Sequence, residues 1–442
     1  MITKSRGFSR GGIHPVGFKE LSNRANIEVF PTPKILTVAL SQHIGAVAEA
    51  IVSVGEHIEV GQLIGKAASF VSANVHSPVS GTVKEIRPIT LPVGISCDAI
   101  VIEADEVQPN CYQNEVNSLE ALSQSDILQK ITAAGIVGAG GATFPTHVKL
   151  TIPPGKQAKF IIINGVECEP YLNADNRLMI EHSKEVVKGI MILQKLIGVD
   201  KIFIGIEKNK PIAIKAINEA AKELNFPLNV VPLKIKYPQG DEKQLVEAIT
   251  GMEIPALALP IDIGAVVVNV GSTFAIYEAV LKDKPFFERV VSVSGLGVKK
   301  ASNFFVKIGT PYKLLIDAAL GSYSEAKKFI SGGPMMGFAF YDPDNSFVGK
   351  GTSGILLLTE NEIKQKRQTN CLNCGRCLRV CPMGLHPTKM YRSFQQEDFN
   401  KMLSLGLMDC KECGCCAYSC PAAIALVHSF KMAKREAKKI GG

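Results

Sequence analysis

Two hydrophobic patterns divide the first two thirds of the chain. From about residue 27 to 104, short alternating apolar runs are separated by Gly, Pro and Ser, which is typical of a small β domain. From about 118 to 284, apolar runs of strand length alternate with segments of helical periodicity. The apolar runs are 160–163, 201–204, 228–231 and 265–268, and two of the helical segments are 186–197 and 212–224. Alternating strands and helices predict a parallel, Rossmann-like sheet that is covered on both faces.

Two smaller units follow. A strand at 290–293 and a helix at 312–320 predict a small α+β unit between about 289 and 341. From residue 361 to the end, short helices separate two runs of cysteines. The length of 442 residues fits about three domains at roughly 150 residues each, with two or four as alternatives. Because no low-complexity segment separates the units, we expect them to pack against one another.

The β domain contains two segments, 54–64 and 76–83, that resemble the two halves of a lipoyl or biotinyl carrier domain. Such carriers present a modifiable lysine at a hairpin tip, where this chain has residues 67–70, Ala-Ala-Ser-Phe. Lys66 lies too early to replace that lysine. We therefore expect a barrel-sandwich hybrid with a structural role rather than a functional carrier.

Composition excludes several classes of protein. Apolar residues make up 46% and charged residues 20%, which fits neither a disordered chain nor a disulfide-bonded miniprotein. One of the two longest charge-free runs lies between Lys130 and Lys149, and its glycines, Pro145 and His147 make it a poor membrane span. The first twelve residues are basic but lack an apolar core. We therefore expect no transmembrane helix and no signal peptide, and a chain that stays in the cytoplasm.

The cysteines carry the strongest chemical signal, because nine of the twelve fall between Cys371 and Cys420. Two runs have the spacing C-x2-C-x2-C-x3-C-P, which bacterial-type ferredoxins use for [4Fe-4S] clusters, with the fourth cysteine crossing to the other cluster. The first cysteine set should be Cys371, Cys374, Cys377 and Cys420. The second cysteine set should be Cys381, Cys410, Cys413 and Cys416. Two structural zinc sites are the alternative, but zinc does not explain the x3-Cys-Pro ending.

The net positive charge of the chain is concentrated at its C-terminal end. From Lys364 onward the chain has fourteen Lys and Arg against five Asp and Glu. A basic segment can bind nucleic acid or an anionic membrane, but this one also holds eight cysteines in cluster spacing. Its cations would first offset the negative charge of the clusters, so we do not expect a nucleic-acid partner.

A glycine-rich loop opens the α/β domain at residues 138–141 and is followed by Lys149. Glycines let backbone N–H groups approach a phosphate or a flat ring, and a nearby lysine suits a phosphate or a flavin carbonyl. A plain structural turn is an equally common reason for such a cluster. The loop alone is therefore weak evidence for a nucleotide site.

Two carboxylates follow the first predicted strand of the parallel sheet. Glu167 and Glu169 lie just beyond 160–163, and in open parallel sheets ligands collect at the carboxyl ends of strands. Because the two residues are two apart, we expect their side chains to face the same way in an extended segment. A solvated acidic loop is the alternative, although the nearby glycine loop favours a site.

Taken together, these motifs resemble one known family, the RnfC subunits of the Rnf complex, an ion-translocating oxidoreductase between NADH and ferredoxin. The matching segments are 11–15, 138–149, 164–170 with Asp175, 237–244, 332–337 and both cysteine runs. The resemblance implies a multidomain α/β protein with four parts. These are a barrel-sandwich hybrid at 1–115, a Rossmann-like FMN/NADH domain at 116–286, a soluble-ligand-binding β-grasp domain at 287–345 and a helical dicluster [4Fe-4S] ferredoxin module at 346–442.

The resemblance also assigns roles to residues near the nicotinamide nucleotide. It implies that Gly138, Gly140 and Gly141 lie against FMN and NADH. Phe144 would lie near the adenine, and Glu169 would be the carboxylate near the nicotinamide.

Further residues match flavin contacts of the family. In the first half of the domain these are Lys149, Asn164 and Glu167. The second flavin loop corresponds to Gly240 and Glu242. Asn269 and Thr273 fall where the flavin subunit of respiratory complex I binds the FMN phosphate, although that relative has two successive asparagines there and this chain has Asn269-Val270.

The function implied is that of a peripheral electron-input subunit. It would exchange hydride with NAD(H) at FMN and relay single electrons through two [4Fe-4S] clusters to other subunits of a membrane-embedded complex, one of them ferredoxin-like. We expect it on the cytoplasmic face of the cell membrane, attached through its partners. Two alternatives are a soluble flavin and iron-sulfur NADH reductase, which would begin near the glycine loop, and a flavin-free scaffold subunit of a quinone reductase, which would lack the eight cysteines.

Overall fold

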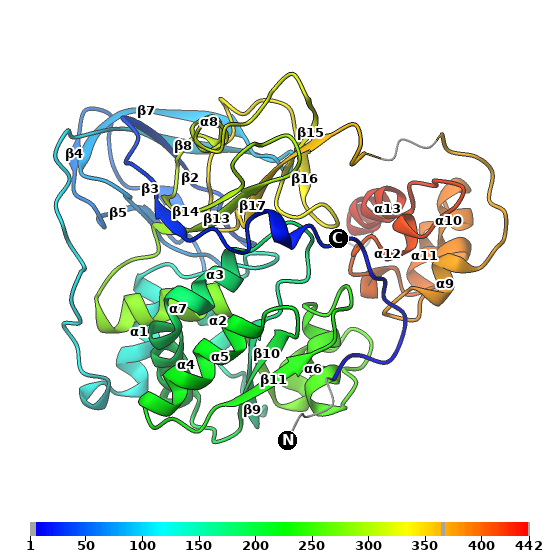
Figure 1. The fold of residues 1–442 in the computed structure, drawn as a ribbon, viewed down its shortest axis with the longest axis horizontal. Coiled ribbons are helices and arrows are strands. Elements are labelled where there is room, and N and C mark those ends of the chain that lie inside the picture. Colours follow the sequence, from blue (N-terminus) through cyan, green and yellow to red (C-terminus); the bar gives the residue numbers. More distant parts are fainter. Residues whose placement is uncertain (1–5, 364–366, 441–442) are drawn as a thin grey trace.

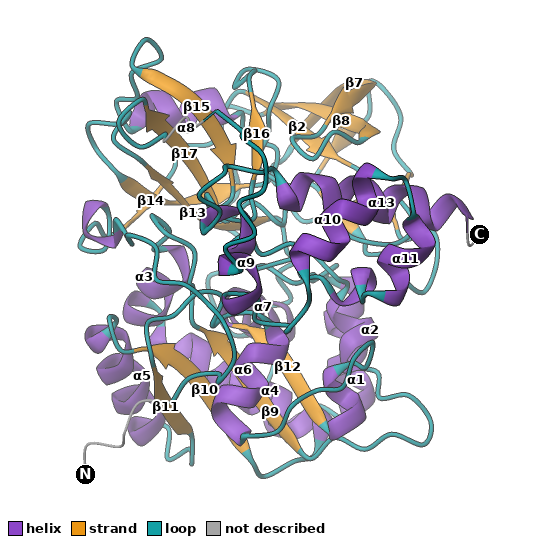
Figure 2. Ribbon diagram, turned by 90° about the vertical axis from the view of Figure 1, so that its right-hand side faces the viewer, coloured by secondary structure: helices purple, strands orange, loops and turns teal. Residues whose placement is uncertain are grey.

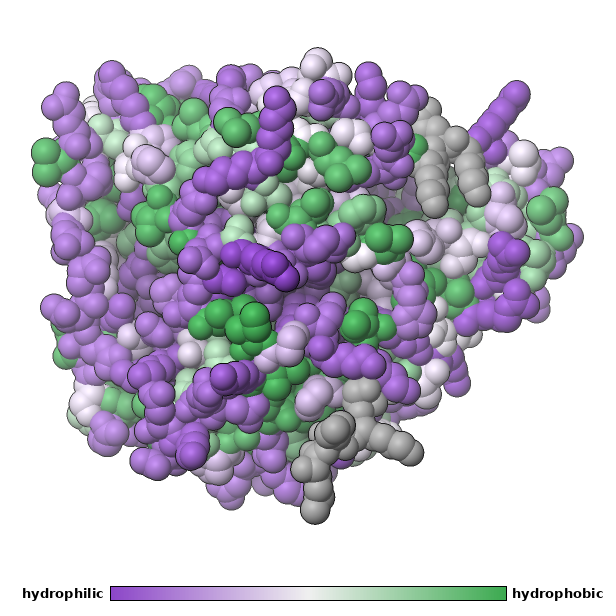
Figure 3. Space-filling view, viewed as in Figure 1, coloured by the Kyte–Doolittle hydropathy of each residue, from purple (hydrophilic) through white to green (hydrophobic). Residues whose placement is uncertain are grey.

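The computed structural model describes residues 6–363 and 367–440. Three β-containing units form the main body, and the cysteine-rich helical module projects from one side of it (Figure 1). Among the described residues, we find no helix with the length and apolar character needed to cross a bilayer. The face shown in Figure 3 is largely polar, with hydrophobic side chains scattered over it.

The N-terminal unit is a barrel-sandwich of two antiparallel sheets. One has the order β2 (Ile35–Ala39), β8 (Ser96–Ala104), β7 (Gly81–Thr90), β4 (His57–Ile58). The other has the order β3 (Glu49–Ala50), β5 (Leu63–Lys66), β6 (Val75–His76). Alternating side chains such as Leu36, Val38 and Ile100 fill the space between them and are fully buried. This confirms the predicted β domain.

The hairpin tip of this unit rests on the next domain. The carbonyl oxygen of Phe70 lies 3.0 Å from Nε2 of His147, in α2 (Thr146–Leu150). The rings of the two residues meet edge to face. The tip therefore serves as a packing contact, which agrees with a structural role for the domain.

The second unit is built on a four-stranded parallel sheet. Its order is β11 (Asn229–Leu233), β10 (Ile202–Glu207), β9 (Phe160–Gly165), β12 (Ala265–Asn269). The helices of this unit include α1 (Gln124–Ala133), α3 (Ala174–Glu181), α4 (Ser183–Ile197), α5 (Pro211–Glu223), α6 (Glu242–Thr250) and α7 (Val270–Leu281), with short turns at Leu119–Ala121 and Pro260–Ile263.

Successive residues of the strand β9 pack on opposite faces of this sheet. Ile161 and Ile163 pack in one core with side chains of α1, α4, α5 and α7, whereas Phe160 and Ile162 pack in a second core with α6. This is why the strand reads as one continuous apolar run. The predicted parallel sheet and its covering on both faces are confirmed.

The third unit is a six-stranded mixed sheet with one helix, α8 (Tyr312–Ala318). Its order is β1 (Ile27–Val29), β14 (Ser302–Lys307), β13 (Glu288–Ser294), β17 (Gly354–Thr359), β15 (Ala326–Ser331), β16 (Phe338–Phe340). The range 287–345, which the sequence resemblance implies for the β-grasp domain, leaves out two strands of this sheet, β1 and the central strand β17. In β17, Ile355 and Leu357 join one core and Leu356 and Leu358 another, so the sheet needs this strand to cover both faces.

The C-terminal module consists of short helices around a small core. They are α9 (Arg376–Arg379), α10 (Pro387–Gln395), α11 (Phe399–Ser404), a turn at Leu407–Asp409, α12 (Cys415–Tyr418) and α13 (Leu426–Ile440). The core contains Met390, Met402 and Phe430. Figure 2 shows the module standing in front of the main body.

The N-terminal segment, which includes the turn Lys19–Leu21, runs between the module and the main body. The backbone N–H of Gly12 donates to the carbonyl of Val380 at 2.9 Å, and Ile13 bridges to Tyr237. At Gly11, which has φ +61°, an added Cβ would lie 2.5 Å from the carbonyl oxygen of Cys381. Glycine therefore permits this close approach.

Candidate functional site

The predicted polar residues meet at the carboxyl ends of two neighbouring strands. Asn164 in β9 and Asn269 in β12 are paired in the sheet register. The amide of Asn164 donates to the carbonyl of Gly240 at 2.8 Å, and its oxygen accepts from the N–H of Val166 at 3.2 Å. Asn164 thus ties the loop that precedes α6 to the strand end.

Asn269 is the N-cap of α7. Its oxygen accepts from the N–H groups of Gly271 at 2.7 Å and Ser272 at 3.3 Å, and its Nδ2 donates to Asp175 at 2.9 Å. The Thr273 hydroxyl donates back to the carbonyl of Asn269 at 3.0 Å. Thr273 is fully buried, so in this structure its hydroxyl serves the first turn of the helix.

The glycine loop lies directly over this helix start. The N–H of Gly138 donates to the carbonyl of Phe144 at 2.9 Å and closes the loop, in which Phe144 is half-buried. A Cβ on Gly140 would lie 2.5 Å from Nδ2 of Asn269, whereas Gly141, at φ +150°, faces open space. The exposed backbone of Gly140 and Gly141 is therefore free to meet a flat or anionic group.

Lys149 and Glu242 form an ion pair, although they are 93 residues apart in the sequence. Lys149 comes from α2, and its ammonium group also donates to the carbonyl of Val267 in β12 at 3.1 Å. Glu242 opens α6 directly after its N-cap, Asp241. The pair therefore places a lysine near the carboxyl end of β12.

Glu167 lies in the turn after β9 with φ +46°, a left-handed conformation that is rare for this residue type. Its carboxylate accepts from the N–H groups of Asp175 at 2.8 Å and Asn176 at 3.2 Å, and so caps α3. The Lys19 side chain, which is 15% exposed, donates to the carbonyl of Glu167 at 2.8 Å, and desolvation lowers the pKa of this lysine to about 8.

The carboxylate of Glu169 contacts the third unit, whereas that of Glu167 caps α3 in the second unit. The Glu169 carboxylate accepts from the N–H groups of Met335 and Met336, both at 3.0 Å, in the loop between β15 and β16. The Tyr237 hydroxyl lies 3.4 Å away. Burial raises the pKa of the Glu169 carboxyl to about 7. The expectation that Glu167 and Glu169 face the same way is wrong, because the left-handed turn at Glu167 breaks the extended geometry.

The loop at 237–242 connects this site with the cysteine module. On one side, the N–H of Gly240 lies 3.4 Å from Sγ of Cys168. On the other side, Sγ of Cys415 lies 3.9 Å from the carbonyl oxygen of Tyr237. Cys415 is buried among Ile13, Tyr237 and neighbouring cysteines.

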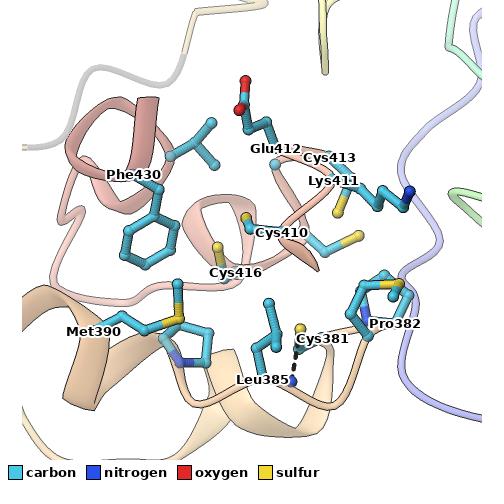
Figure 4. A pocket seen from close by; sticks show the side chains of 15 residues that line it. Cys381, Pro382, Leu385, Met390, Cys410, Lys411, Glu412, Cys413, Cys416 and Phe430 are labelled. Atoms are coloured by element: carbon cyan, nitrogen blue, oxygen red, sulfur yellow. Dashed lines mark hydrogen bonds between the residues drawn. The ribbon is translucent and has the colours of Figure 1, made fainter. Parts of the chain in front are cut away.

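The second cysteine set lines one cavity. Figure 4 shows Cys381 on one segment facing Cys410, Cys413 and Cys416 on the other, with Met390 and Phe430 closing the space. The N–H of Leu385 points at Sγ of Cys381 at 3.4 Å. Within the described ranges, no three His, Cys, Asp or Glu side chains converge closely enough to bind a single ion. Cys381 thus lines the same cavity as the cysteines of the other run, Cys415 included, and its predicted role as the fourth ligand there stays a prediction.

The first cysteine set is more exposed than the second. Cys371, Cys377 and Cys420 pack half-buried against its core, and Cys374 is exposed. Sγ of Cys377 lies 3.1 Å from the hydroxyl of Thr388.

Sequence reasoning missed several residues that shape the site. The most important are Lys19, which supports the Glu167 turn, and Arg289, whose buried guanidinium donates to the carbonyl of Ala139 in the glycine loop at 3.1 Å. Both belong to other parts of the chain. No local pattern marks them, because their partners are defined by domain packing.

Comparison with known proteins follows the same division into domains. Three family models match: the RnfC barrel sandwich hybrid domain at 8–107, the Nuo51 FMN-binding domain at 131–278 and a 4Fe-4S dicluster domain at 363–421. A subunit of the proton-translocating ferredoxin:NAD(+) oxidoreductase complex of Clostridium ljungdahlii is 45% identical over 86% of this chain and 83% of that protein. The chain belongs to the RnfC family of ion-translocating oxidoreductase subunits.

Other relatives agree with this assignment. The corresponding subunit of the Na(+)-translocating ferredoxin:NAD(+) oxidoreductase complex of Acetobacterium woodii is 42% identical over 97% of both chains. Its counterpart in the ion-translocating oxidoreductase complex of Rhodobacter capsulatus is 41% identical over 96% of this chain and 82% of that protein. The match at 8–107 disfavours a reductase that begins near the glycine loop, and the dicluster match disfavours a scaffold without cysteines.

A solved structure shares the fold. An NAD+-reducing [NiFe]-hydrogenase in the H2-reduced state superposes with a TM-score of 0.52 at 16% identity, over 72% of this chain and 62% of that chain. This similarity shows the fold alone.

Proposed function

We propose that this chain is the peripheral electron-input subunit of a membrane-bound ferredoxin:NAD+ oxidoreductase, with a nucleotide site at the strand ends and two [4Fe-4S] clusters in the C-terminal module. One observation carries the proposal: the loop at 237–242 contacts the strand-end site through Gly240 and the cysteine module through Tyr237. A single short segment therefore separates the place for a flavin from the second cysteine set.

The strand-end residues fit FMN. Gly140 and Gly141 leave backbone exposed without side chains, and Lys149, paired with Glu242, places an ammonium group at Val267 near the end of β12. FMN accepts a hydride from NADH and releases electrons one at a time, so it would connect a two-electron donor with clusters that accept single electrons.

Each predicted residue has a proposed task in binding. Gly138, Gly140 and Gly141 would let the two nucleotides approach the backbone, and Phe144 would stack on the adenine. The proposed flavin contacts are Lys149, Asn164, Glu167, Gly240 and Glu242. Asn269, at the start of α7, would lie at the FMN phosphate, which suits a helix N-terminus. Thr273 is fully buried and bonds the carbonyl of Asn269, so it would support the first turn of that helix instead of contacting the phosphate. Glu169 would orient the nicotinamide.

The cysteines fit iron-sulfur clusters. Four sulfur atoms of the second cysteine set border one cavity, and Lys434 donates to the carbonyl of Cys410 at 2.6 Å, which places a cation beside it. Thiolate ligands from two separated runs are what a dicluster fold requires.

The proposed location is the cytoplasmic face of the cell membrane, reached through partner subunits that include a ferredoxin-like protein. The partners proposed for the chain are these subunits and NAD(H).

Anaerobic purification of the full chain tests the proposal. We expect noncovalent FMN, about eight iron and eight sulfide per chain, and bleaching of the flavin by NADH. Zinc in place of iron after anaerobic reconstitution, or the absence of extractable FMN, would contradict it.

A further inference from the structure

Arg289 is a buried cation that reaches from the third unit into the glycine loop of the second unit. It lies in β13 and is 7% exposed. Its Nη1 donates to the carbonyl of Ala139 at 3.1 Å and also to the carbonyl of Lys350, while its Nε donates to the carbonyl of Val290 at 3.3 Å. The guanidinium group is thus bonded to the glycine loop and to two neighbours in its own unit.

Ala139 is held from two sides. Its N–H donates to Oγ of Ser272 at 2.8 Å, which ties it to the first turn of α7. Its carbonyl accepts from Arg289 in the third unit. In a planar trans peptide group, the C=O of one residue and the N–H of the next point in opposite directions. The N–H of Gly140 therefore points away from Arg289.

The N–H of Gly140 is a donor at the place proposed for FMN. Within residues 6–363 and 367–440 it has no hydrogen-bond partner. Gly140 is exposed and lies over the start of α7, where a Cβ on it would be 2.5 Å from Nδ2 of Asn269. A backbone N–H beside a helix N-terminus suits an anionic oxygen, because both supply partial positive charge.

Arg289 also acts on the cap of this helix. Burial and the nearby charge of Glu167 raise the pKa of the Asp175 carboxyl, and the charge of Arg289 opposes this rise. Asp175 accepts from Nδ2 of Asn269, the N-cap of α7, at 2.9 Å. One cation therefore supports both the loop over the helix start and the carboxylate that orients the cap.

Resting on the function proposed above, we infer that Arg289 is a positioning residue for FMN. By holding the carbonyl of Ala139, it keeps the following peptide group in the orientation that presents the N–H of Gly140 to an acceptor oxygen of FMN. Arg289 acts through the loop and not by contact with the cofactor. Without the guanidinium group this peptide can rotate and place its carbonyl where the N–H was, which would repel an anionic oxygen.

Packing between the second and third units explains Arg289 less well. A buried charge stabilises an interface only if its partners are well placed, and an apolar side chain often serves packing equally well. The units are also joined nearby by Lys350, whose ammonium group donates to the carbonyls of Asn74 at 2.6 Å and Gly135 at 2.7 Å. The contact that belongs to Arg289 alone is the one that sets the direction of the Gly140 N–H.

Replacing Arg289 by methionine tests the inference, with Arg177→Met as the matched control. Arg177 is also 7% exposed, and its partners, which include Glu181 and Asn26, lie outside the glycine loop. Both variants remove a buried guanidinium group, so the comparison isolates the contact with Ala139. The readouts on the full chain are the FMN dissociation constant from fluorescence quenching, the rate of flavin bleaching by NADH at saturating FMN, and the melting temperature.

We expect Arg289→Met to raise the FMN dissociation constant about tenfold and Arg177→Met to change it less than about twofold, although both lower the melting temperature. At saturating FMN, the bleaching rate of Arg289→Met should return to within about threefold of the unaltered protein, because only binding is weakened. Arg289→Lys keeps the charge but not the planar group, so it should raise the dissociation constant about threefold.

An unchanged FMN dissociation constant in Arg289→Met, or an equal rise in both arginine variants, would overturn the inference. A bleaching rate that stays low at saturating FMN would overturn it as well. If Arg289→Met does not fold, Arg289→Lys against Arg177→Lys replaces the pair, and equal dissociation constants would have the same meaning. Failure of the unaltered chain to bind FMN would instead contradict the proposed function, which keeps the two outcomes apart.

Discussion

The side-chain amide of Asn164 donates a 2.8 Å hydrogen bond to the carbonyl of Gly240. This bond joins the carboxyl end of β9 to the loop that also touches the cysteine module through Tyr237. The geometry of the proposed flavin site and the position of the second cysteine set are thus coupled through one segment of the chain.

Replacing Asn164 by alanine removes this bond and the acceptor for Val166. We expect FMN affinity to fall about five- to tenfold, since one hydrogen bond contributes about 1 kcal/mol. Asn218→Ala is the control, because Asn218 bonds the carbonyl of Ile214 on the exposed side of α5. Flavin titration by fluorescence quenching measures both variants, and equal affinity would exclude a role for Asn164.

At Gly140, even one methyl group would lie 2.5 Å from the amide of Asn269, which caps α7. We expect Gly140→Leu to abolish FMN binding and to destabilise the domain by about 1–3 kcal/mol through overpacking. Gly349→Ala is the control, since its Cβ would meet Gln42 at an ordinary 3.6 Å. Full FMN occupancy in Gly140→Leu, measured after gel filtration, would refute the role of the loop.

Two neighbouring thiols of the module should behave differently. Cys381→Ala should remove or alter the cluster proposed at Cys410, Cys413 and Cys416, because the sequence spacing makes Cys381 its fourth ligand and not Cys415, which lines the same cavity. Cys415→Ala should keep about eight iron per chain, since Cys415 packs against Tyr237. Iron analysis and electron paramagnetic resonance of the reduced proteins distinguish these outcomes. Loss of iron in both variants would make Cys415 a ligand.

Glu169→Gln separates binding from chemistry. We expect normal FMN and iron content but a measurable change, of the order of tenfold or about 1.4 kcal/mol, in flavin reduction by NADH or in inhibition by NAD+. Anaerobic stopped-flow spectroscopy measures the rate. Glu253→Gln, at an exposed position after α6, is the control. An unaltered rate and unaltered inhibition in Glu169→Gln would mean that the nicotinamide lies elsewhere.

The same carboxyl should titrate near neutrality. Its pKa is raised from 4.5 to about 7 by burial, so the folded state binds this proton more tightly than the unfolded state. Its contribution to the free energy of unfolding therefore falls as the pH rises from about 4.5 to about 7, by about 3 kcal/mol in total. Infrared spectroscopy should show a protonated-carboxyl band at about pH 6 that is lost by about pH 8 and is absent in Glu169→Gln. A band unchanged between these pH values would contradict the assignment.

Local patterns were enough to predict the elements and the cysteine arrangement. The apolar run at 160–163 became β9, and the helical period at 186–197 became α4, because side-chain periodicity depends on neighbours in sequence. The spacing also predicted that Cys381 groups with Cys410, Cys413 and Cys416, and these four cysteines do line one cavity.

Tertiary packing decided the rest. Glu169 and Met335 are 166 residues apart, and no periodicity in either segment indicates that they meet. The left-handed turn at Glu167, which Lys19 supports, directs the carboxylates of Glu167 and Glu169 to different partners. The strand β17 belongs to the third sheet although it lies beyond residue 345, the expected end of that domain. Contacts of this kind depend on how whole domains bury their surfaces against each other. Surface burial and hydrogen bonding between domains depend on the complete chain. Helices, strands and the spacing of metal ligands depend on a few residues that are adjacent in the sequence.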